Sequence, residues 1–557
     1  MIVPMGEPSV ADPVHRWARR PISDDVVARW IADGWWRDES LGDMVAAGLG
    51  RLDGTRFEVH SKFRPWSGTF ADVDRAARSM ATELRARGVG YGDVIVVQLP
   101  NWVEAGITFW AAAYLGAVVV PIVHFYGVKE VDYILRSTQP AVVVSADRFG
   151  HVEHLDVHAA AMANTPVEHW FVVGDTPAAD LPAGAAAFDT LLHAEPLATH
   201  AKVDPDAPTV IGFTSGTTRD PKGVVHSHRT IACETRQLDH MYPHGGPPPI
   251  TGAPVGHFIG MLNAFLTPLL REREVHLVDV WDPGEVLRLM RTEHIGVSGG
   301  ATYFMTSLLD HPDFSDEHLA LMPYAGLGGS TVPIAVMERM AGMGIKAFRS
   351  YGSTEHPSIT GSLIDEPEIK RHTTDGHAMP GVEIRLTDEG EILSRGPDCC
   401  IGYTDPELTA RVFDEDGWYH SGDVGVMDDD GYLAITDRLS DVIIRGGENI
   451  SAQEVEEELL GLDAVAEAAV VGRPDDRLGE RAAAIVRLRD GHDAPTLDEV
   501  RAHLEAVGLA RQKWPESIHT VADFPRTPSG KVQKYRLRAQ LRDGELTETT
   551  EATEATP

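Results

Sequence analysis

The sequence is poor in cysteine, and this shortage excludes one class of protein. Only three of its 557 residues are cysteines: Cys233, Cys399 and Cys400. So few thiols cannot form a disulfide scaffold and they suit a reducing compartment, so we expect a cytoplasmic protein. The cysteines and histidines show no spacing that is typical of a zinc site.

Basic residues are also scarce relative to acidic ones. The chain has 49 Lys and Arg against 84 Asp and Glu, a formal net charge of −35 at pH 7. Phosphate backbones and anionic lipid headgroups both attract basic surfaces. We therefore expect neither nucleic acid nor an anionic membrane surface among the partners of this protein.

Long apolar runs are nearly absent. One uncharged stretch, Ala105 to Val123, approaches the length of a membrane span. Gly116 and Pro121 interrupt it, and it divides naturally into a buried helix, Trp102 to Leu115, and a buried strand, Ala117 to Ile122. The N-terminal residues contain no apolar signal segment. We expect a soluble protein without an integral membrane segment.

The first part of the chain alternates helical and strand patterns. Apolar residues recur at helical spacing from Asp72 to Arg87, and Gly88 ends that helix. An apolar strand, Val94 to Leu99, follows, and then the helix and strand just named. Strand–helix–strand succession predicts a parallel sheet covered on both faces, and hence an α/β fold. Further apolar runs of this kind are Ala141 to Val144, Trp170 to Val173, Val275 to Val278 and Val382 to Leu386.

The pattern changes after Gly431, where a smaller α+β domain is expected. Ser451 with Glu454 three residues later is a capping-box signature for a helix from Ala452 to Leu460. The last residues, Asp543 to Pro557, lack apolar periodicity and predict a disordered acidic tail. We therefore divide the chain into a large domain (1–437), a small domain (438–542) and the tail (543–557). Other elements predicted after Gly431 are strands Tyr432 to Thr436, Ala468 to Val471 and Ala482 to Leu488, and a helix near Leu497 to Glu505.

One loop carries most of the chemical information. Between two apolar runs lie four hydroxyl side chains, two glycines and a lysine: Thr214, Ser215, Gly216, Thr217, Thr218, Lys222 and Gly223. Backbone N–H groups, hydroxyls and one ammonium can together hold phosphate oxygens. The spacing is not that of a Walker A loop, and no helical pattern follows directly. By composition alone, a flexible surface loop is an equally good interpretation.

The order of residues resembles the TSGTTxxPKG phosphate-binding signature of the adenylate-forming superfamily, which includes acyl- and aryl-CoA synthetases, adenylation domains and firefly luciferase. Further motifs of that family follow in its order, over roughly Phe63 to Leu537. The matching segments are Leu99-Pro100-Asn101-Trp102, Gly116 to Pro121, Pro254 with His257 and Gly260, Tyr351-Gly352-Ser353-Thr354-Glu355, Trp418 to Asp423, and Pro525 to Lys531.

The resemblance implies a fold and a two-step reaction. The fold would be a large N-terminal domain of parallel and mixed sheets with helices and a β subdomain, followed by the small mobile domain. In step one a carboxylate attacks the α-phosphate of ATP and releases pyrophosphate. In step two a thiol, usually that of coenzyme A, takes the acyl group and expels AMP. Such chemistry needs fixed positive charge and positioning more than covalent catalysis.

The resemblance also implies roles for individual residues. Lys531, Glu355 and Lys222 would be catalytic, with Lys531 bridging the attacking carboxylate and the α-phosphate. Glu355, with Thr214, would hold Mg²⁺, a hard ion that prefers oxygen ligands. Asp423 would accept hydrogen bonds from the ribose hydroxyls, and Arg438 would reinforce that end. The remaining ATP and AMP contacts would come from Ser215, Gly216, Thr217, Thr218, Gly328, Gly329, Ser330, Ser350, Tyr351, Gly352, Ser353 and Thr354.

The acyl pocket would be lined by His257, Phe258, Met261, Thr302 and Gly326. Amino-acid-activating relatives place an aspartate after the phenylalanine near this histidine, but here Phe258 is followed by Ile259. We therefore predict a carboxylic acid without an α-amino group, of aliphatic, alicyclic or aromatic type. The Leu-Pro-Asn-Trp segment is most similar to that of medium-chain and cyclohexanecarboxylate-type CoA ligases.

The pantetheine of coenzyme A would pass along Arg445-Gly446-Gly447, and Ser440 would be the hinge of the small domain. Two positions depart from the family pattern: Arg219 replaces the usual glycine of the phosphate loop, and Ser440 replaces a usually charged hinge residue. Two alternatives to an acyl-CoA ligase stay open: a ligase that loads a carrier-protein thiol, and a weakly catalytic binding relative. A homodimer is also left open.

Overall fold

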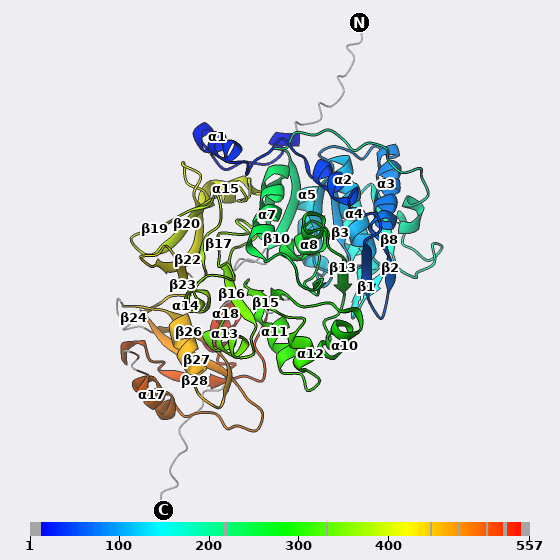
Figure 1. Ribbon diagram of the computed structural model, residues 1–557. Helices are drawn as coiled ribbons and strands as arrows, with labels where there is room; N and C mark the ends of the chain where they lie inside the picture. Colours follow the sequence, from blue (N-terminus) through cyan, green and yellow to red (C-terminus); the bar gives the residue numbers. More distant parts are fainter. Residues whose placement is uncertain are drawn as a thin grey trace, which may run out of the picture. The chain divides into compact units, whose positions relative to one another are not determined.

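The first half of the chain supplies seven strands of the central sheet of eight, and β21 is the eighth (Figure 1). The computed structural model describes residues 13–214, 221–329, 332–439, 441–445, 448–475, 479–507, 509, 511–526 and 532–546. The strand order is β21-β11-β10-β4-β3-β5-β8-β9. These strands are β3 (Val94–Gln98), β4 (Val118–Pro121), β5 (Val142–Ala146), β8 (His169–Val173), β9 (Ala185–Ala187), β10 (Pro208–Thr214), β11 (Lys222–Ser227) and β21 (Gly402–Tyr403).

The sheet is parallel from β10 to β9 and antiparallel at its other edge. Strands β3, β4, β5, β8, β9 and β10 pair in parallel, whereas β11 pairs antiparallel with both β10 and β21. The predicted α/β class with parallel and mixed sheets is therefore confirmed. A short β-ribbon of β6 (Arg148–Phe149) and β7 (Val152–Glu153) lies outside the sheet.

Helices cover both faces of this sheet, which explains why its strands are apolar throughout. Alternate residues such as Val94, Val96 and Val120 form one cluster with Ile134 of α5 (Val128–Thr138). The intervening residues face α4 (Val103–Leu115), which packs against α3 (Phe70–Ala86). The division of residues 105–123 into helix and strand is thus confirmed. In the part of the chain that the structure describes, no helix combines the length and apolarity needed to cross a bilayer.

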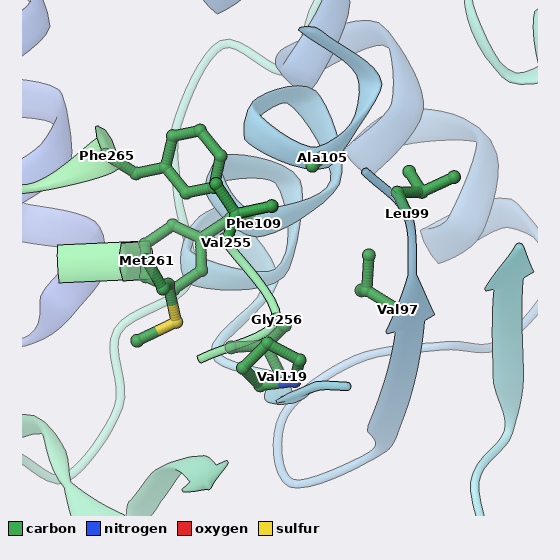
Figure 2. Close-up of a pocket in the computed structure, with 10 residues that line it drawn as sticks. Val97, Leu99, Ala105, Phe109, Val119, Val255, Gly256, Met261 and Phe265 are labelled. Carbon is green, nitrogen blue, oxygen red and sulfur yellow. The ribbon is translucent and has the colours of Figure 1, made fainter. Parts of the chain in front are cut away.

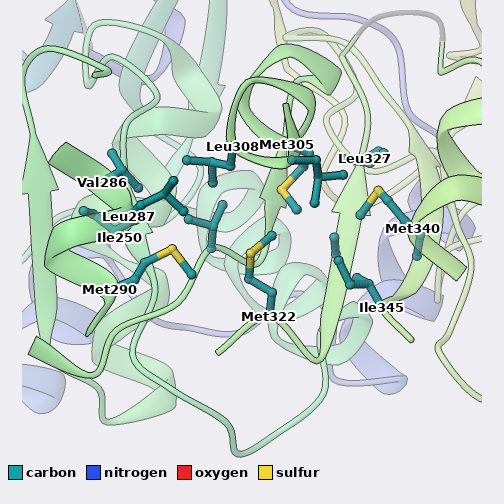
Figure 3. Packing of buried hydrophobic residues seen from close by; sticks show 14 of the residues in the cluster. Ile250, Val286, Leu287, Met290, Met305, Leu308, Met322, Leu327, Met340 and Ile345 are labelled. Carbon is teal, nitrogen blue, oxygen red and sulfur yellow. The ribbon is translucent and has the colours of Figure 1, made fainter. Parts of the chain in front are cut away.

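Two smaller sheets accompany the central one. The first has the order β12-β13-β1-β2, and the second β14-β15-β16-β17-β18. Helices α10, α11 and α13 supply Met290, Met305 and Met340 to an apolar core that also includes Leu327 of β15 (Figure 3). The strands are β1 (Arg56–His60), β2 (Trp66–Thr69), β12 (Ile250–Thr251), β13 (Val275–Val278), β14 (Gly299–Gly300), β15 (Tyr324–Leu327), β16 (Lys346–Tyr351), β17 (Thr360–Gly361) and β18 (His377–Ala378).

The structure divides into two compact units, Met1–Ile384 with Ser394–Tyr419, and Arg385–Leu393 with His420–Pro557. The domain boundary expected between residues 437 and 438 stays a prediction. The other α-helices of the first unit are α1 (Asp24–Ala32), α2 (Leu41–Leu49), α6 (His154–Met162), α7 (His228–Met241), α8 (Phe258–Phe265), α9 (Thr267–Arg271), α10 (Pro283–Glu293), α11 (Thr302–Leu309), α12 (Asp316–Leu319), α13 (Ile334–Gly342), α14 (Glu368–Thr373) and α15 (Pro406–Val412).

The second unit contains two sheets, of order β19-β20-β22-β23 and β25-β24-β27-β26, with β28 beside β27. Its helices are α16 (Ala452–Leu459), α17 (Leu497–Ala506) and α18 (Lys534–Arg542), and the predicted tail starts where α18 ends. The strands are β19 (Glu383–Leu386), β20 (Glu391–Arg395), β22 (Tyr419–Met427), β23 (Leu433–Arg438), β24 (Ile443–Arg445), β25 (Glu448–Ile450), β26 (Val465–Asp475), β27 (Gly479–Leu488) and β28 (Ser517–Thr520).

Helix α16 has one of the two hydrogen bonds of the predicted capping box. Ser451 Oγ accepts a hydrogen bond from the backbone N–H of Glu454, at 3.1 Å. The Glu454 carboxylate, which a full capping box would direct back to residue 451, instead accepts from Lys513 Nζ at 2.6 and 2.8 Å. A distant lysine has therefore replaced the local partner.

We expect a buried histidine to make the first unit sensitive to acid. His228 Nδ1 accepts a hydrogen bond from the Leu41 N–H at 3.1 Å, and burial lowers the pKa of this histidine to about 4. In the unfolded chain His228 is protonated below about pH 6.5, whereas in the folded chain it stays neutral down to about pH 4. Protonation therefore favours the unfolded chain between these pH values, and the free energy of unfolding decreases as the pH falls from 6.5 toward 4. The slope for one proton is about 1.4 kcal/mol per pH unit.

Urea unfolding of wild type, His228→Asn and His240→Asn at pH values from 7 to 4.5 measures this slope. The asparagine at position 228 can still accept from Leu41 but does not titrate, so its slope should be smaller by about one proton. His240 is exposed on the same helix, and its variant should behave like wild type. Equal slopes for all three proteins would contradict the prediction.

Candidate active site

The candidate site lies where strand β10 ends and strand β11 begins. Thr214, the last residue of β10, pairs with Lys222, the first residue of β11. The hairpin connection between them, which includes the predicted phosphate loop, therefore starts at the carboxyl end of β10, and β10 is parallel to β4. Ligands of open α/β sheets bind outside the carboxyl ends of such strands.

A glycine in β10 allows the next part of the site to approach. A Cβ atom on Gly212 would lie 2.8 Å from Thr354 Cγ2 and 3.4 Å from Phe258 Cδ2. Only a residue without a side chain leaves room for both neighbours. The structure thus brings the predicted Tyr351–Glu355 segment and the predicted acyl-pocket segment to one strand.

The Tyr351–Glu355 segment is a tight loop that follows β16. Tyr351 pairs with Thr360 of β17, and a Cβ atom on Gly352 would lie only 1.8 Å from the Pro357 carbonyl oxygen. A buried ion pair between Arg349 and Asp375, at 2.9 Å, supports the strand just before the loop. Ser350 and Tyr351 are the last two residues of β16, immediately before this loop.

The backbone of this loop is also held by a histidine. His226 of β11 lies 2.7 Å from the Thr354 carbonyl oxygen through Nε2, and its ring packs at 4.6 Å from the Phe258 ring. Its Nδ1 lies 3.1 Å from Thr230 Oγ1. Burial lowers the pKa of His226 to about 4, so the ring is neutral and Nε2 can donate to the carbonyl.

Glu355 is buried, with 7% of its surface exposed. Its carboxylate oxygen Oε1 accepts a hydrogen bond from the Tyr403 hydroxyl at 2.9 Å, and its carbonyl oxygen accepts from the Cys400 N–H at 2.7 Å. Burial, followed by the charge of Glu355, raises the pKa of Tyr403 far above its usual value, so the phenol remains a donor. The single carboxylate with the Thr214 hydroxyl fits Mg²⁺, which takes one or two carboxylates and completes its shell with phosphate and water oxygens.

The predicted acyl-pocket segment is anchored by Asn101. Its side-chain amide donates to the carbonyl oxygens of Ala253 and Val278, at 3.0 and 2.9 Å, and its carbonyl oxygen accepts from the Val255 N–H at 2.8 Å. These bonds hold the residues that lead into His257, which immediately precedes α8. The family landmark Leu99 to Trp102 therefore has a positioning role that its sequence did not disclose.

Two polar atoms in the predicted acyl pocket are buried without a hydrogen-bond partner among the described residues: His257 Nε2 and Thr302 Oγ1. Burial lowers the pKa of His257 to about 4, so its ring is neutral. The Phe125 ring lies 6.5 Å from that of His257. Buried polar groups are normally paired, so the two atoms are available to a polar group of a ligand.

A small apolar cavity lies behind this segment. Its volume is about 10 Å³, and Figure 2 shows Met261 and Phe265 of α8 beside it together with Phe109 of α4 and Val97 of β3. A cavity of this size and lining is too small and too apolar to hold an ordered water.

The glycines of the predicted site lie at places where chains approach closely. A Cβ atom on Gly326 would lie 2.6 Å from the Tyr242 hydroxyl oxygen, and one on Gly328 would lie 2.8 Å from the Ser350 carbonyl oxygen. Gly329 has a φ of +78°, which disfavours other residues. Gly328 and Gly329 thus lie beside the strand that leads to Tyr351.

Two predicted site residues, Asp423 and Arg438, belong to the second unit. They pair across strands β22 and β23, and Arg438 Nε lies 2.8 Å from Asp423 Oδ1. Asp423 is buried, whereas the Arg438 side chain is 42% exposed. Arg445, predicted to contact coenzyme A, forms an ion pair with Glu516 at 2.6 Å. The structure therefore places Asp423 and Arg438 side by side, and the roles that the resemblance implies for them stay predictions.

Several predicted residues lie outside the described part of the chain. They are Ser215, Gly216, Thr217, Thr218, Arg219, Ser330, Ser440, Gly446, Gly447 and Lys531. Their roles, and those assigned to Ser353, Thr354 and the other ATP contacts, stay predictions.

Sequence reasoning missed His226 and Tyr403. His226 sits in an apolar strand, and Tyr403 follows a glycine in a short segment, so each has the pattern of a core residue. A signal does exist for His226, because a histidine within an apolar strand requires a hydrogen-bond partner. The sequence around Tyr403 gives no comparable indication, because its neighbours Cys399 and Cys400 do not suggest a polar partner for its hydroxyl.

The described features of the candidate site are the Thr214–Lys222 pair at the end of β10, the buried carboxylate of Glu355 and, in the second unit, the Asp423–Arg438 pair. The sequence pattern of the AMP-binding enzyme family matches residues 58–404, and that of the AMP-binding enzyme C-terminal domain matches residues 454–531. The chain belongs to this family.

Curated relatives include the medium-chain fatty-acid–CoA ligase of Escherichia coli (strain K12), which is 34% identical over 529 residues and covers 92% of each chain. Another is the 3-[(3aS,4S,7aS)-7a-methyl-1,5-dioxo-octahydro-1H-inden-4-yl]propanoyl:CoA ligase of Rhodococcus jostii (strain RHA1). It is 37% identical over 501 residues, with 85% of this chain and 93% of that protein covered. Among solved structures, ATP-bound MatB from Rhodopseudomonas palustris aligns with a TM-score of 0.80 at 27% identity, covering 91% of this chain and 99% of that one.

We predict that Arg20 stabilises the segment that holds Glu355. Arg20 is buried, and its guanidinium donates to the carbonyl oxygens of Cys400, Gly396, Cys399 and Gly417 at 2.8, 3.0, 3.3 and 3.3 Å. Arg20→Ala would leave those carbonyls without their charged donor, at a cost of about 3 kcal/mol or more.

Chemical unfolding measures this loss, with Arg29→Ala as the matched control. Arg29 lies in the same N-terminal part of the chain but forms an exposed ion pair with Glu383, worth about 1 kcal/mol or less. If both variants lost the same small amount, Arg20 would not be the anchor of the 396–400 segment.

Proposed function

We propose that this protein is an AMP-forming acid–thiol ligase. It activates a carboxylic acid with ATP, releases pyrophosphate, and transfers the acyl group to coenzyme A with release of AMP. The observation that carries the proposal is the convergence on strand β10: Thr214 and Lys222 pair at its end, and the loop that carries Glu355 contacts it at Gly212. The named relatives, which are CoA ligases, support the same reaction.

In the first step the protein must bring two anions together. Lys222 supplies positive charge beside the phosphate loop, and Glu355 with Thr214 would hold Mg²⁺. When bound, Mg²⁺ neutralises phosphate charge that develops in the reaction. Tyr351 would stack on adenine beside Gly328 and Gly329, and Asp423 would bind the ribose hydroxyls.

The acid is proposed to be apolar and to lack an α-amino group. Helix α8 begins with Phe258 and Ile259 and contains no acidic residue that could bind an ammonium group. Its buried Met261 borders an apolar region, while His257 Nε2 and Thr302 Oγ1 are free for the carboxylate end. A medium-chain fatty acid and a bicyclic propanoate, named for the relatives, are both acids of this kind.

Free coenzyme A is the proposed thiol, because the relatives named above are CoA ligases. The Arg445-Gly446-Gly447 turn would let pantetheine pass. Three buried free cysteines suit a reducing compartment, so we place the reaction in the cytoplasm.

The test is a panel of acids incubated with ATP and Mg²⁺, with and without coenzyme A. Octanoate, cyclohexanecarboxylate and benzoate should stimulate pyrophosphate release, whereas amino acids should not, and acyl-CoA should form only when coenzyme A is present. Lys531→Ala should lower acid-dependent ATP–pyrophosphate exchange by about 10²–10³-fold, because a preorganised charge contact is lost.

The same variant should still convert a pre-made acyl-adenylate to the thioester. Lys513→Ala, which removes a lysine paired with Glu454, is the matched control and should affect neither step. An equal loss in both steps would refute the role of Lys531, and the absence of acid-dependent pyrophosphate release in wild type would refute the proposed function.

The two steps are proposed to use different orientations of the small domain. Lys531 must reach the acid in step one, whereas the thiol must reach the same carbonyl in step two, so a rotation near Ser440 would exchange the two faces. Proline fixes φ, so Ser440→Pro should slow one half-reaction at least tenfold more than the other. Single-turnover measurements of both steps check this, and small, equal effects would show that Ser440 is not the hinge.

A further inference from the structure

The side chain of Tyr403 holds the carboxylate of Glu355 but has no role in the reaction proposed above. Tyr403 is the last residue of β21, where it pairs with Val224 of β11, two residues after Lys222. Its hydroxyl is 2.9 Å from Glu355 Oε1, and only 1% of the residue is exposed. Among the described residues, the Tyr403 hydroxyl is the group that donates a hydrogen bond to the Glu355 carboxylate.

The position of this phenol is fixed from several directions. The Tyr403 N–H donates to Thr409 Oγ1 at 2.9 Å, and the next residue, Thr404, donates to the Gly223 carbonyl oxygen at 2.8 Å. The Phe413 ring packs 6.4 Å from the tyrosine ring. A side chain that is locked by packing and strand pairing can fix the orientation of its hydrogen-bond partner.

The same short segment holds the backbone of Glu355 as well. The Cys400 N–H donates to the Glu355 carbonyl oxygen at 2.7 Å, three residues before Tyr403. The backbone and the carboxylate of Glu355 are therefore both hydrogen-bonded to the segment 400–403, and Gly402 and Tyr403 of this segment pair with β11. A glutamate side chain has three rotatable bonds; the Cys400 bond fixes the backbone from which it starts, and the Tyr403 bond fixes the carboxylate at its end.

We propose that Tyr403 is a positioning residue for the divalent cation that accompanies ATP. Its phenol holds Oε1 of Glu355, which leaves Oε2 as the oxygen for the cation. This inference rests on the proposed function, because that function assigns the cation to Glu355. Orienting partners of this kind tune a metal ligand without touching the metal.

Tyr403→Phe tests the proposal, because it removes the hydroxyl and leaves the ring. The binding of Mn²⁺ to the protein with a non-hydrolysable ATP analogue is measured by the electron paramagnetic resonance of the free ion. We expect the Mn²⁺ dissociation constant to rise about tenfold, the size of one lost hydrogen bond to a charged group. In pyrophosphate-release assays the Mg²⁺ concentration for half-maximal rate should rise by a similar factor, and kcat at saturating Mg²⁺ should be nearly retained.

Tyr114→Phe is the matched control. Tyr114 is likewise buried in the first unit and donates its hydroxyl to a carboxylate, that of Asp74. Its loss removes the same kind of bond away from the site, so stability should fall while the Mn²⁺ dissociation constant stays as in wild type. If Tyr403→Phe bound Mn²⁺ as tightly as wild type, or if Tyr114→Phe weakened it equally, the proposal would be wrong.

A double-mutant cycle with Glu355→Gln completes the test. If the phenol acts through the carboxylate, Tyr403→Phe should weaken Mn²⁺ binding no further in the Glu355→Gln background, whereas an additive loss would overturn the proposal. If circular dichroism shows that Tyr403→Phe folds poorly, Thr409→Val is the second variant, because it removes the hydroxyl that accepts from the Tyr403 N–H. Thr409→Val should raise the Mn²⁺ dissociation constant, and an unchanged value would also overturn the proposal. These binding experiments need no acid, so they succeed or fail separately from the acid panel that tests the function.

Discussion

The close approach of the Thr354 loop to strand β10 is the constraint on which the rest of the candidate site depends. Gly212 has no side chain, and any Cβ atom there would lie 2.8 Å from Thr354. Because the approach is possible, the pair Thr214–Lys222 and the carboxylate of Glu355 belong to one strand edge. A larger residue would push the Thr354 loop away from β10, and a reaction that depends on positioning is sensitive to such a shift.

Buried hydrogen bonds below the loop keep this geometry rigid. His226 holds the Thr354 carbonyl, and Arg20 holds the carbonyls of residues 396–400, whose last N–H holds Glu355. His356 lies 2.7 Å from Ser394 Oγ and 3.2 Å from Asp398; although burial alone would lower the pKa of His356, Asp398 raises it. A polar network that is satisfied in a region of low dielectric resists rearrangement, and electrostatic stabilisation of a reaction requires that resistance.

The predicted site residues are divided between the two units. The carboxylate and the ends of the phosphate loop belong to the first unit, whereas Asp423 and Arg438 pair within the second. Asp437, next to Arg438, accepts a hydrogen bond from the Ala452 N–H at 2.6 Å, so the start of α16 is tied to strand β23 beside the Asp423–Arg438 pair. The Ser451 hydroxyl at the same helix start donates to the Thr436 carbonyl oxygen at 2.7 Å, so two hydrogen bonds join α16 to β23.

The sequence by itself determined the elements and the family. Periodicity predicted β3, α4 and β4 to within one or two residues, because the apolar pattern of a segment reports how that segment is buried. The ordered motifs indicated the family, which the matches over residues 58–404 and 454–531 confirm, since each motif is a local run of chain. The cap of α16 shows the limit: Ser451 was predicted, but the partner of Glu454 is Lys513, which lies 59 residues away.

Only the tertiary structure decided which distant polar groups meet. The bonds of Asn101 to Ala253, of His226 to Thr354 and of Tyr403 to Glu355 join residues that are 152, 128 and 48 positions apart. Burial of a tyrosine or histidine can be predicted from its apolar neighbours, but its partner cannot. The partner is set by strand order and register, which follow from the packing of the whole sheet, and no local stretch of sequence carries that information.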